Sequence, residues 1–93
     1  MPKLLAAKLL ALRKTHGASQ RWMAQLIGVE SHRHISEYER GLRIPSLVTV
    51  LYYARIAGIP MEYIADDDLD LDTFRNHLVR AEGKRGELTT IAR

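Results

Sequence analysis

One edge of a predicted helix at residues 31–39 carries polar side chains suited to hydrogen bonding with a nucleic acid. With about 100° of rotation per residue, that edge consists of His32, Arg33, Ser36 and Glu37. Ile35 and Tyr38 fall on the opposite side, where they can root the helix in a core. An arginine can donate two bonds to guanine O6 and N7, and a glutamate can accept from cytosine N4 or repel a misplaced phosphate. We therefore predict that these four polar residues read base edges in a DNA major groove.

Groups able to hold phosphate lie on either side of this helix. They are Gln20, Arg21, Ser31, Arg40 and Arg43. The first two open another predicted helix, whose free N–H groups and dipole attract anions. Contacts of this kind give affinity and register without reading sequence. For each of these side chains, the competing interpretation is an ordinary solvated surface group.

The elements that would position these residues are all predicted to be helices. No segment alternates apolar and polar residues between hairpin turns. The predicted helices span residues 3–15, 20–27, 31–39, 46–57 and 61–65. In the first of them, Leu5, Leu9 and Leu12 form an apolar stripe. Leu4 and Leu10 lie off that stripe, which indicates either a wide core face or a contact with a partner.

Two more of these helices have clear apolar positions. We expect the core to take Met23, Leu26 and Ile27 from the second helix and Leu47, Val50, Leu51 and Ala54 from the fourth, with Trp22 in the core or at its boundary. Ser19 is a good N-cap for the second helix. Gly28 can adopt the positive φ that ends it.

The order of small and apolar residues between 19 and 47 carries a family resemblance. The matching positions are Ser19-Gln20, Met23-Ala24, Leu26-Ile27, Gly28-Val29, Ile35-Ser36, Glu39, Gly41 and Pro45. In this order they resemble the XRE-type helix-turn-helix family, which includes Cro and the phage repressors, over about residues 3–65. The resemblance implies a five-helix, lambda-repressor-like DNA-binding domain, in which Gln20 contacts phosphate and braces His32. Five residues separate Val29 from Ile35 where the family has four, so the turn should be longer.

Charge and composition agree with a small DNA-binding protein without requiring one. Residues 1–65 contain nine Lys or Arg and four Glu, whereas residues 66–72, DDDLDLD, contain five Asp. A basic folded part favours an anionic partner, although ordinary solvated charge explains it about as well.

The chain has no cysteine, which fits a reducing cytoplasm. No apolar run approaches the roughly 18–20 residues that cross a bilayer, and Lys8 interrupts the apolar run near the N-terminus.

We expect residues 66–72 to form an acidic linker and residues 73–93 a polar C-terminal extension that is part helical. The linker resembles a calcium loop only weakly, because Leu71 and His77 replace the glycine and glutamate such loops need. Competition with DNA for the basic face is a second alternative for it. His32 and His34 point about 200° apart on a helix and cannot chelate one ion. The sequence therefore predicts no metal and no cofactor.

Together these features predict a cytoplasmic, non-enzymatic transcriptional regulator, and by resemblance a repressor that binds double-stranded DNA as a homodimer. Dimer contacts are expected from the fifth helix, from its Tyr63-Ile64 end or from residues 73–93. One alternative is an antitoxin or interaction module that neutralises a toxin through residues 73–93. Another is an adaptor that has kept the fold and lost DNA binding, which Glu30 and Glu37 would favour.

Overall fold

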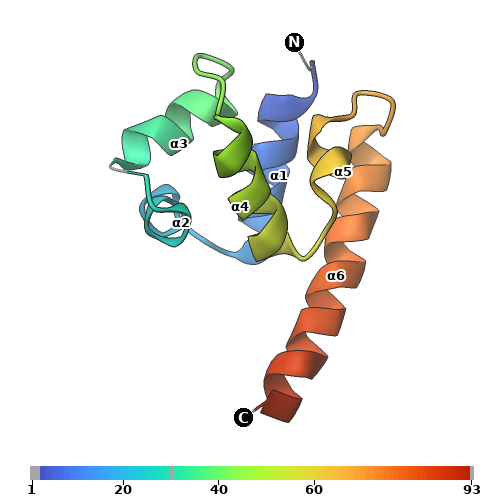
Figure 1. The fold of residues 1–93 in the computed structure, drawn as a ribbon. Coiled ribbons are helices and arrows are strands. Elements are labelled where there is room, and N and C mark those ends of the chain that lie inside the picture. The colour runs from blue at the N-terminus through green and yellow to red at the C-terminus, as the bar shows by residue number, and fades with distance from the viewer. Residues whose placement is uncertain (1–2, 30, 93) are drawn as a thin grey trace.

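The structure is a computed structural model that describes residues 3–29 and 31–92, with side chains described as far as Glu82. Its elements are α1 (Leu5–His16), α2 (Gln20–Ile27), α3 (His32–Glu39), α4 (Leu47–Ala57), α5 (Met61–Ala65) and α6 (Leu71–Ala92) (Figure 1). Within the described ranges there is no strand, so the all-α prediction is confirmed. None of these helices is long and apolar enough to cross a membrane.

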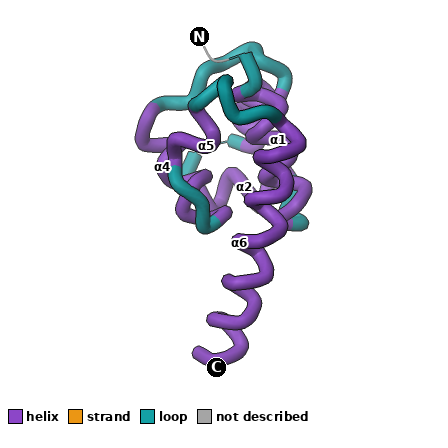
Figure 2. The backbone as a smooth tube through the Cα atoms, turned by 90° about the vertical axis from the view of Figure 1, so that its right-hand side faces the viewer, coloured by secondary structure: helices purple, strands orange, loops and turns teal. Residues whose placement is uncertain are grey.

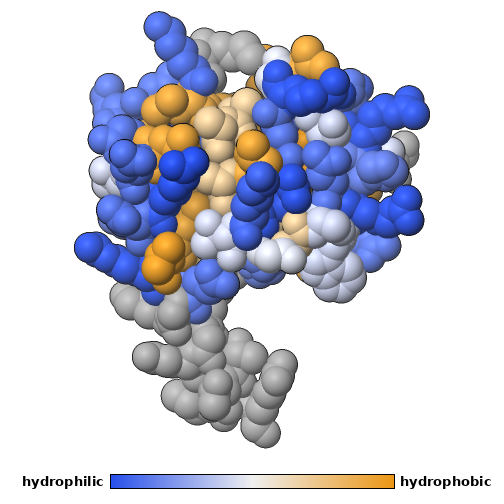
Figure 3. All heavy atoms as spheres, turned by 180° about the vertical axis from the view of Figure 1, so that it is seen from behind, coloured by the Kyte–Doolittle hydropathy of each residue, from blue (hydrophilic) through white to orange (hydrophobic). Residues whose placement is uncertain are grey.

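The core is built around α1, which packs against α3, α4, α5 and α6. The predicted stripe of Leu5, Leu9 and Leu12 is buried. Lys8 and Ala11 are buried as well, and Leu4 and Leu10, which lie off the stripe, are half-buried. From behind, apolar side chains gather where α1 and α6 lie together, and hydrophilic side chains surround them (Figure 3).

Besides the five helices expected, the described residues form a sixth, α6, in the extension that was expected to be part helical. Phe74 and Leu78 of α6 are buried in the core, so the first turns of this helix are part of the domain. Beyond them α6 continues past the rest of the fold (Figures 1 and 2). The segment after residue 72 was expected to be polar because only a few of its residues are apolar. Two of those few, Phe74 and Leu78, make the packing contacts.

Three apolar side chains of α2 and α4 lie on the surface, among them Leu47, which was expected to point inward. Trp22, Leu26 and Leu47 are all exposed. Helix α2 has only eight residues and buries Met23, Ala24 and Ile27. A helix presents one face to a core, so the other apolar residues of α2 are left outside. Leu47 stands at the first position of α4, beyond the buried side of that helix.

The acidic segment between α5 and α6 caps helices. The carboxylate of Asp67 accepts hydrogen bonds from the backbone N–H groups of Lys3 at 2.6 Å and Leu4 at 3.0 Å, at the start of α1. Asp70 accepts from the N–H of Thr73 at 2.7 Å and so caps α6. These bonds hold the pKa values of Asp67 and Asp70 below the ordinary aspartate value. Among the described residues, no group of three or more His, Cys, Asp or Glu could hold a metal ion.

Lys8 joins α1 to the end of α5 from inside the core. Its ammonium group donates to the carbonyl oxygens of Tyr63 at 2.8 Å and Asp66 at 2.6 Å, and it lies 5.4 Å from the ring centroid of Phe74. Burial lowers the pKa of Lys8, and the negative charges of Asp67 and Asp66 partly oppose that change. The fold thus buries a charge but satisfies it with carbonyls left free at a helix C-terminus.

Candidate nucleic-acid interface

Helices α2 and α3 are joined by a short turn whose ends are set by two residues. Gly28 ends α2 with a positive φ of 86°, which a side chain would disfavour. Ser31 begins α3, because its hydroxyl accepts from the N–H of Arg33 at 3.1 Å. Since Ser31 is the N-cap, the first helical residue is His32. The five residues between Val29 and Ile35 therefore include an ordinary N-cap, Ser31, and the first three residues of α3.

The two sides of α3 differ as predicted. Ile35 is fully buried and Tyr38 nearly so, and together they fix α3 on the core. His32 and Arg33, in the first turn, are exposed. Ser36 and Glu37 are half-buried, and so lie at the margin of the surface that α3 presents to solvent.

An ion pair joins one predicted base-reading residue to one predicted phosphate-binding residue. Arg43 donates from Nε to Oε1 of Glu37 at 3.3 Å. The pair lies at the end of α3 and partly neutralises both groups. Glu37 is therefore held by Arg43 before any partner binds, which the spacing of these residues in the sequence did not predict.

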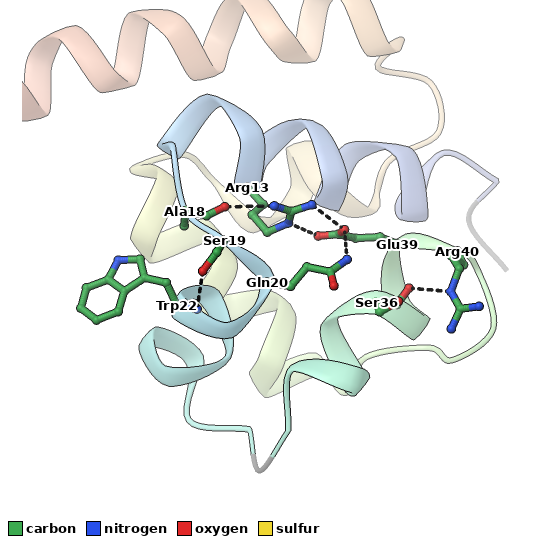
Figure 4. Close-up of polar contacts among 8 residues, drawn as sticks. All are labelled: Arg13, Ala18, Ser19, Gln20, Trp22, Ser36, Glu39 and Arg40. Atoms are coloured by element: carbon green, nitrogen blue, oxygen red, sulfur yellow. Dashed lines mark hydrogen bonds and ion pairs between the residues drawn. The ribbon is translucent and has the colours of Figure 1, made fainter.

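A buried network behind α3 connects it to α1 and α2 (Figure 4). Arg13 of α1 makes two bonds to the carboxylate of Glu39, from Nε at 2.6 Å and from Nη2 at 3.0 Å. Its Nη1 donates to the carbonyl of Ala18 at 3.0 Å. The hydrogen bond to Glu39 raises the pKa of Arg13. This bidentate geometry is the strongest common form of charged hydrogen bond in proteins. Here it joins the C-terminal end of α3 to α1.

Gln20, at the start of α2, belongs to the same network. Its amide Nε2 donates to Oε1 of Glu39 at 3.1 Å (Figure 4), a partner that the family resemblance did not imply. Sequence reasoning placed Glu39 in the motif but assigned it no role, and it missed Arg13. A signal was present in the sequence. Arg13 and Glu39 carry opposite charges, and each directly follows a buried residue of its helix, Leu12 and Tyr38 respectively.

The remaining predicted phosphate-binding residues border α3. Arg21 is exposed in the first turn of α2. Arg40 and Arg43 are exposed just after α3, and Nε of Arg40 donates to the carbonyl of Ser36 at 3.4 Å. Exposed basic groups thus lie in the first turn of α2 and just after α3, and the bond from Gln20 to Glu39 places the start of α2 beside the C-terminal end of α3.

A family model described as a helix-turn-helix domain matches residues 4–65. The chain belongs to the helix-turn-helix domain family. This agrees with the resemblance to XRE-type proteins found in residues 19–47. A comparison with curated proteins found no match, and neither did one with solved structures.

Helix-turn-helix domains use a pair of helices joined by a short turn to bind DNA. In such domains the second helix of the pair enters the DNA major groove, and the first crosses the backbone. In this helix-turn-helix protein those helices are α3 and α2. The matched residues end at Ala65, so the capping segment and α6 lie outside the family pattern.

Proposed function

We propose that this helix-turn-helix protein binds double-stranded DNA at specific sequences and represses transcription. The observation that carries the proposal is the two-sided character of α3, with Ile35 fully buried and His32 and Arg33 exposed. In this proposal Arg33 pairs with a guanine in the major groove, and His32 and Ser36 contact neighbouring base edges. Glu37 accepts from a cytosine or excludes misaligned sites.

Five residues are assigned to the phosphate backbone in this proposal. They are Gln20, Arg21, Ser31, Arg40 and Arg43. The first turn of α2 supplies free N–H groups and a positive dipole end, which favour an anion beside Gln20 and Arg21. Arg43 keeps its bond to Glu37 and turns its other guanidinium nitrogens to phosphate, so that both partners act together.

The proposal includes a homodimer that binds an inverted repeat. In helix-turn-helix dimers the two-fold axis of the protein matches that of the operator, with half-site centres about 34–36 Å apart. A regulator of this kind acts where the genome lies, so a cytoplasmic location is part of the proposal. It also assigns the protein a binding role and no catalysis.

Selection of bound duplexes from a random pool tests this function directly. The expected result is an enriched inverted repeat whose half-sites are about one helical turn apart. With Arg33→Ala the enriched repeat should lose its base preference at one position of each half-site, because a base-reading group is removed, and with Arg75→Ala, on the exposed surface of α6, the preference should persist. Recovery of duplexes with no shared sequence would contradict the proposal.

A second candidate function is suggested by the length of α6. This helix continues past the rest of the fold (Figures 1 and 2) and so offers surface to a protein partner, as an antitoxin offers its C-terminal segment to a toxin. Truncation after Glu82 separates the two functions. It should leave DNA binding intact, whereas an antitoxin would lose its ability to neutralise a toxin encoded beside it.

A further inference from the structure

The outward side of α4 is apolar and uncovered in the single chain. Leu47, Val48 and Tyr52 are 72%, 56% and 41% exposed, and Leu51 between them is half-buried. These four residues form two adjacent i, i+4 pairs on one side of the helix. In Figure 1, α4 lies at the front of the molecule with α1 behind it. We call these four residues the α4 face.

A hollow adjoins the N-terminal half of the α4 face. It has a volume of about 240 Å³ and lies between α4, α5 and the start of α1. Its lining is almost entirely apolar and includes Leu5, Ile44, Leu47, Met61 and Ala65. Ile44 is itself 56% exposed. A ridge of apolar side chains beside an apolar hollow is a shape that can receive an apolar ridge from another helix.

Several side chains in the parts of the chain first expected to supply dimer contacts are engaged within the fold. Ile64 is fully buried. The ring of Tyr63 is half-buried and lies 4.6 Å, centroid to centroid, from the ring of His77. Phe74 and Leu78 of α6 are also buried. Among the residues whose side chains are described, α4 thus leaves more large apolar side chains exposed than α5 or α6 does.

We infer that the α4 face binds the α4 face of a second copy of this chain, with the two helices antiparallel about a two-fold axis. This inference rests on the proposed function and names the surface that its dimer would use. Two-fold symmetry pairs a patch with itself. With the axis near the middle of the face, Tyr52 of each copy lies over Leu47 of the other, and Leu51 lies over Val48.

The exposed area supports a dimer of moderate strength. The exposed fractions of Ile44, Leu47, Val48 and Tyr52 correspond to about 400 Å² of surface, within the range of the largest apolar patches on soluble proteins. Two copies would then bury about 800 Å² before the polar rim is counted. A specific interface needs roughly 1,000 Å², so polar residues at the rim would have to supply the remainder.

Charge around the α4 face is complementary under the same symmetry. Arg55, one turn beyond Leu51, is exposed at the C-terminal end of the face. Glu62 is exposed on α5 and follows Met61, which lines the hollow at the N-terminal end. Antiparallel packing brings Arg55 of each copy toward Glu62 of the other. The interface would therefore contain this opposite-charge pair twice, once on each side of the axis.

Sedimentation equilibrium of the full chain without DNA tests the interface. The parent protein should form a dimer, and Leu47→Asp should raise the dimer dissociation constant by about tenfold or more, because it places a carboxylate against the Tyr52 ring of the other copy in an apolar interface. Leu47 is largely exposed, so the variant should keep its melting temperature. Val79→Asp, at a residue 62% exposed on α6, is the matched control and should leave the dimer unchanged.

Charge reversal provides a second measurement that only this arrangement explains. Arg55→Glu and Glu62→Arg should each weaken the dimer, and the double variant should restore it. A monomeric parent protein, a dimer that withstands Leu47→Asp, or a double variant as weak as the singles would overturn the inference. Binding to a duplex with one half-site is measured in parallel. If that binding persists while the parent is monomeric, the interface is wrong and the DNA-binding function stands.

Discussion

Replacing Glu39 with leucine should destabilise the protein by about 3–5 kcal/mol, because it leaves the guanidinium of Arg13 buried without its anion. The side chains of Arg13 and Glu39 are 13% and 4% exposed, so water can replace little of the lost pairing. Only the Ala18 carbonyl would remain as an acceptor for Arg13, and the Gln20 amide would lose its acceptor as well. Domains of this size are stable by only about 5–15 kcal/mol, and the melting temperature should fall by on the order of 20 °C.

Urea unfolding followed by helical circular dichroism measures this effect. Arg13→Met should cost a similar amount, because it leaves the Glu39 carboxylate buried. The double variant Arg13→Met, Glu39→Leu should lie within about 1–2 kcal/mol of the parent, since no unpaired charge remains. The exposed pair Arg75–Asp72, at 3.7 Å, is the control, and Arg75→Met should change stability by less than about 0.5 kcal/mol. Additive losses in the double variant would refute the reasoning.

Four further predictions concern DNA binding and the extension beyond the family pattern. Arg33→Ala should lose about 1–3 kcal/mol of discrimination at one operator position, measured by titration against operator and single-substitution duplexes. Arg43→Ala should weaken binding to operator and scrambled duplexes alike and lower the salt slope by about one; an unchanged slope would remove this residue from the phosphate contacts. The pKa of Asp67 is lowered in the folded state, so its carboxylate stabilises the fold above the ordinary aspartate pKa, and that contribution is lost as the pH falls through the lowered value. The difference in melting temperature between the parent and Asp67→Asn should therefore shrink on acidification, and a constant difference would argue against the capping role. Phe74→Ala should cost about 3–5 kcal/mol in urea unfolding, whereas a loss below about 1 kcal/mol would mean that α6 is not part of the core.

The helix-turn-helix itself could be predicted closely from the sequence because its boundaries depend on local chemistry. The bounds of α2 are those predicted, since Ser19 caps its start and Gly28 ends it. In α3, the spacing of Ile35 and Tyr38 sufficed to divide a buried side from an exposed one. Such features need only the residues within one or two turns.

The features that the sequence did not predict depend on contacts between distant residues. Arg13 and Glu39 are 26 positions apart, and no local pattern pairs them. Asp67 looked like one charge in an acidic linker, but it accepts from backbone groups 63 and 64 positions away. Leu47 was expected inside because α4 is apolar on several sides, and only the arrangement of the helices packed against it, α1, α2, α5 and α6, decides which side is covered.

The bonds from Lys8 and Asp67 also constrain the order in which a growing chain can fold. The contacts between α2 and α3 span few residues and can form early, since local contacts form fastest. The ammonium group of Lys8, in contrast, finds its acceptors only after residue 66 has been synthesised, and the start of α1 only after residue 67. On the ribosome, α2 and α3 can therefore pack together well before the start of α1 is fixed, and the core is complete only once Phe74 and Leu78 have been synthesised.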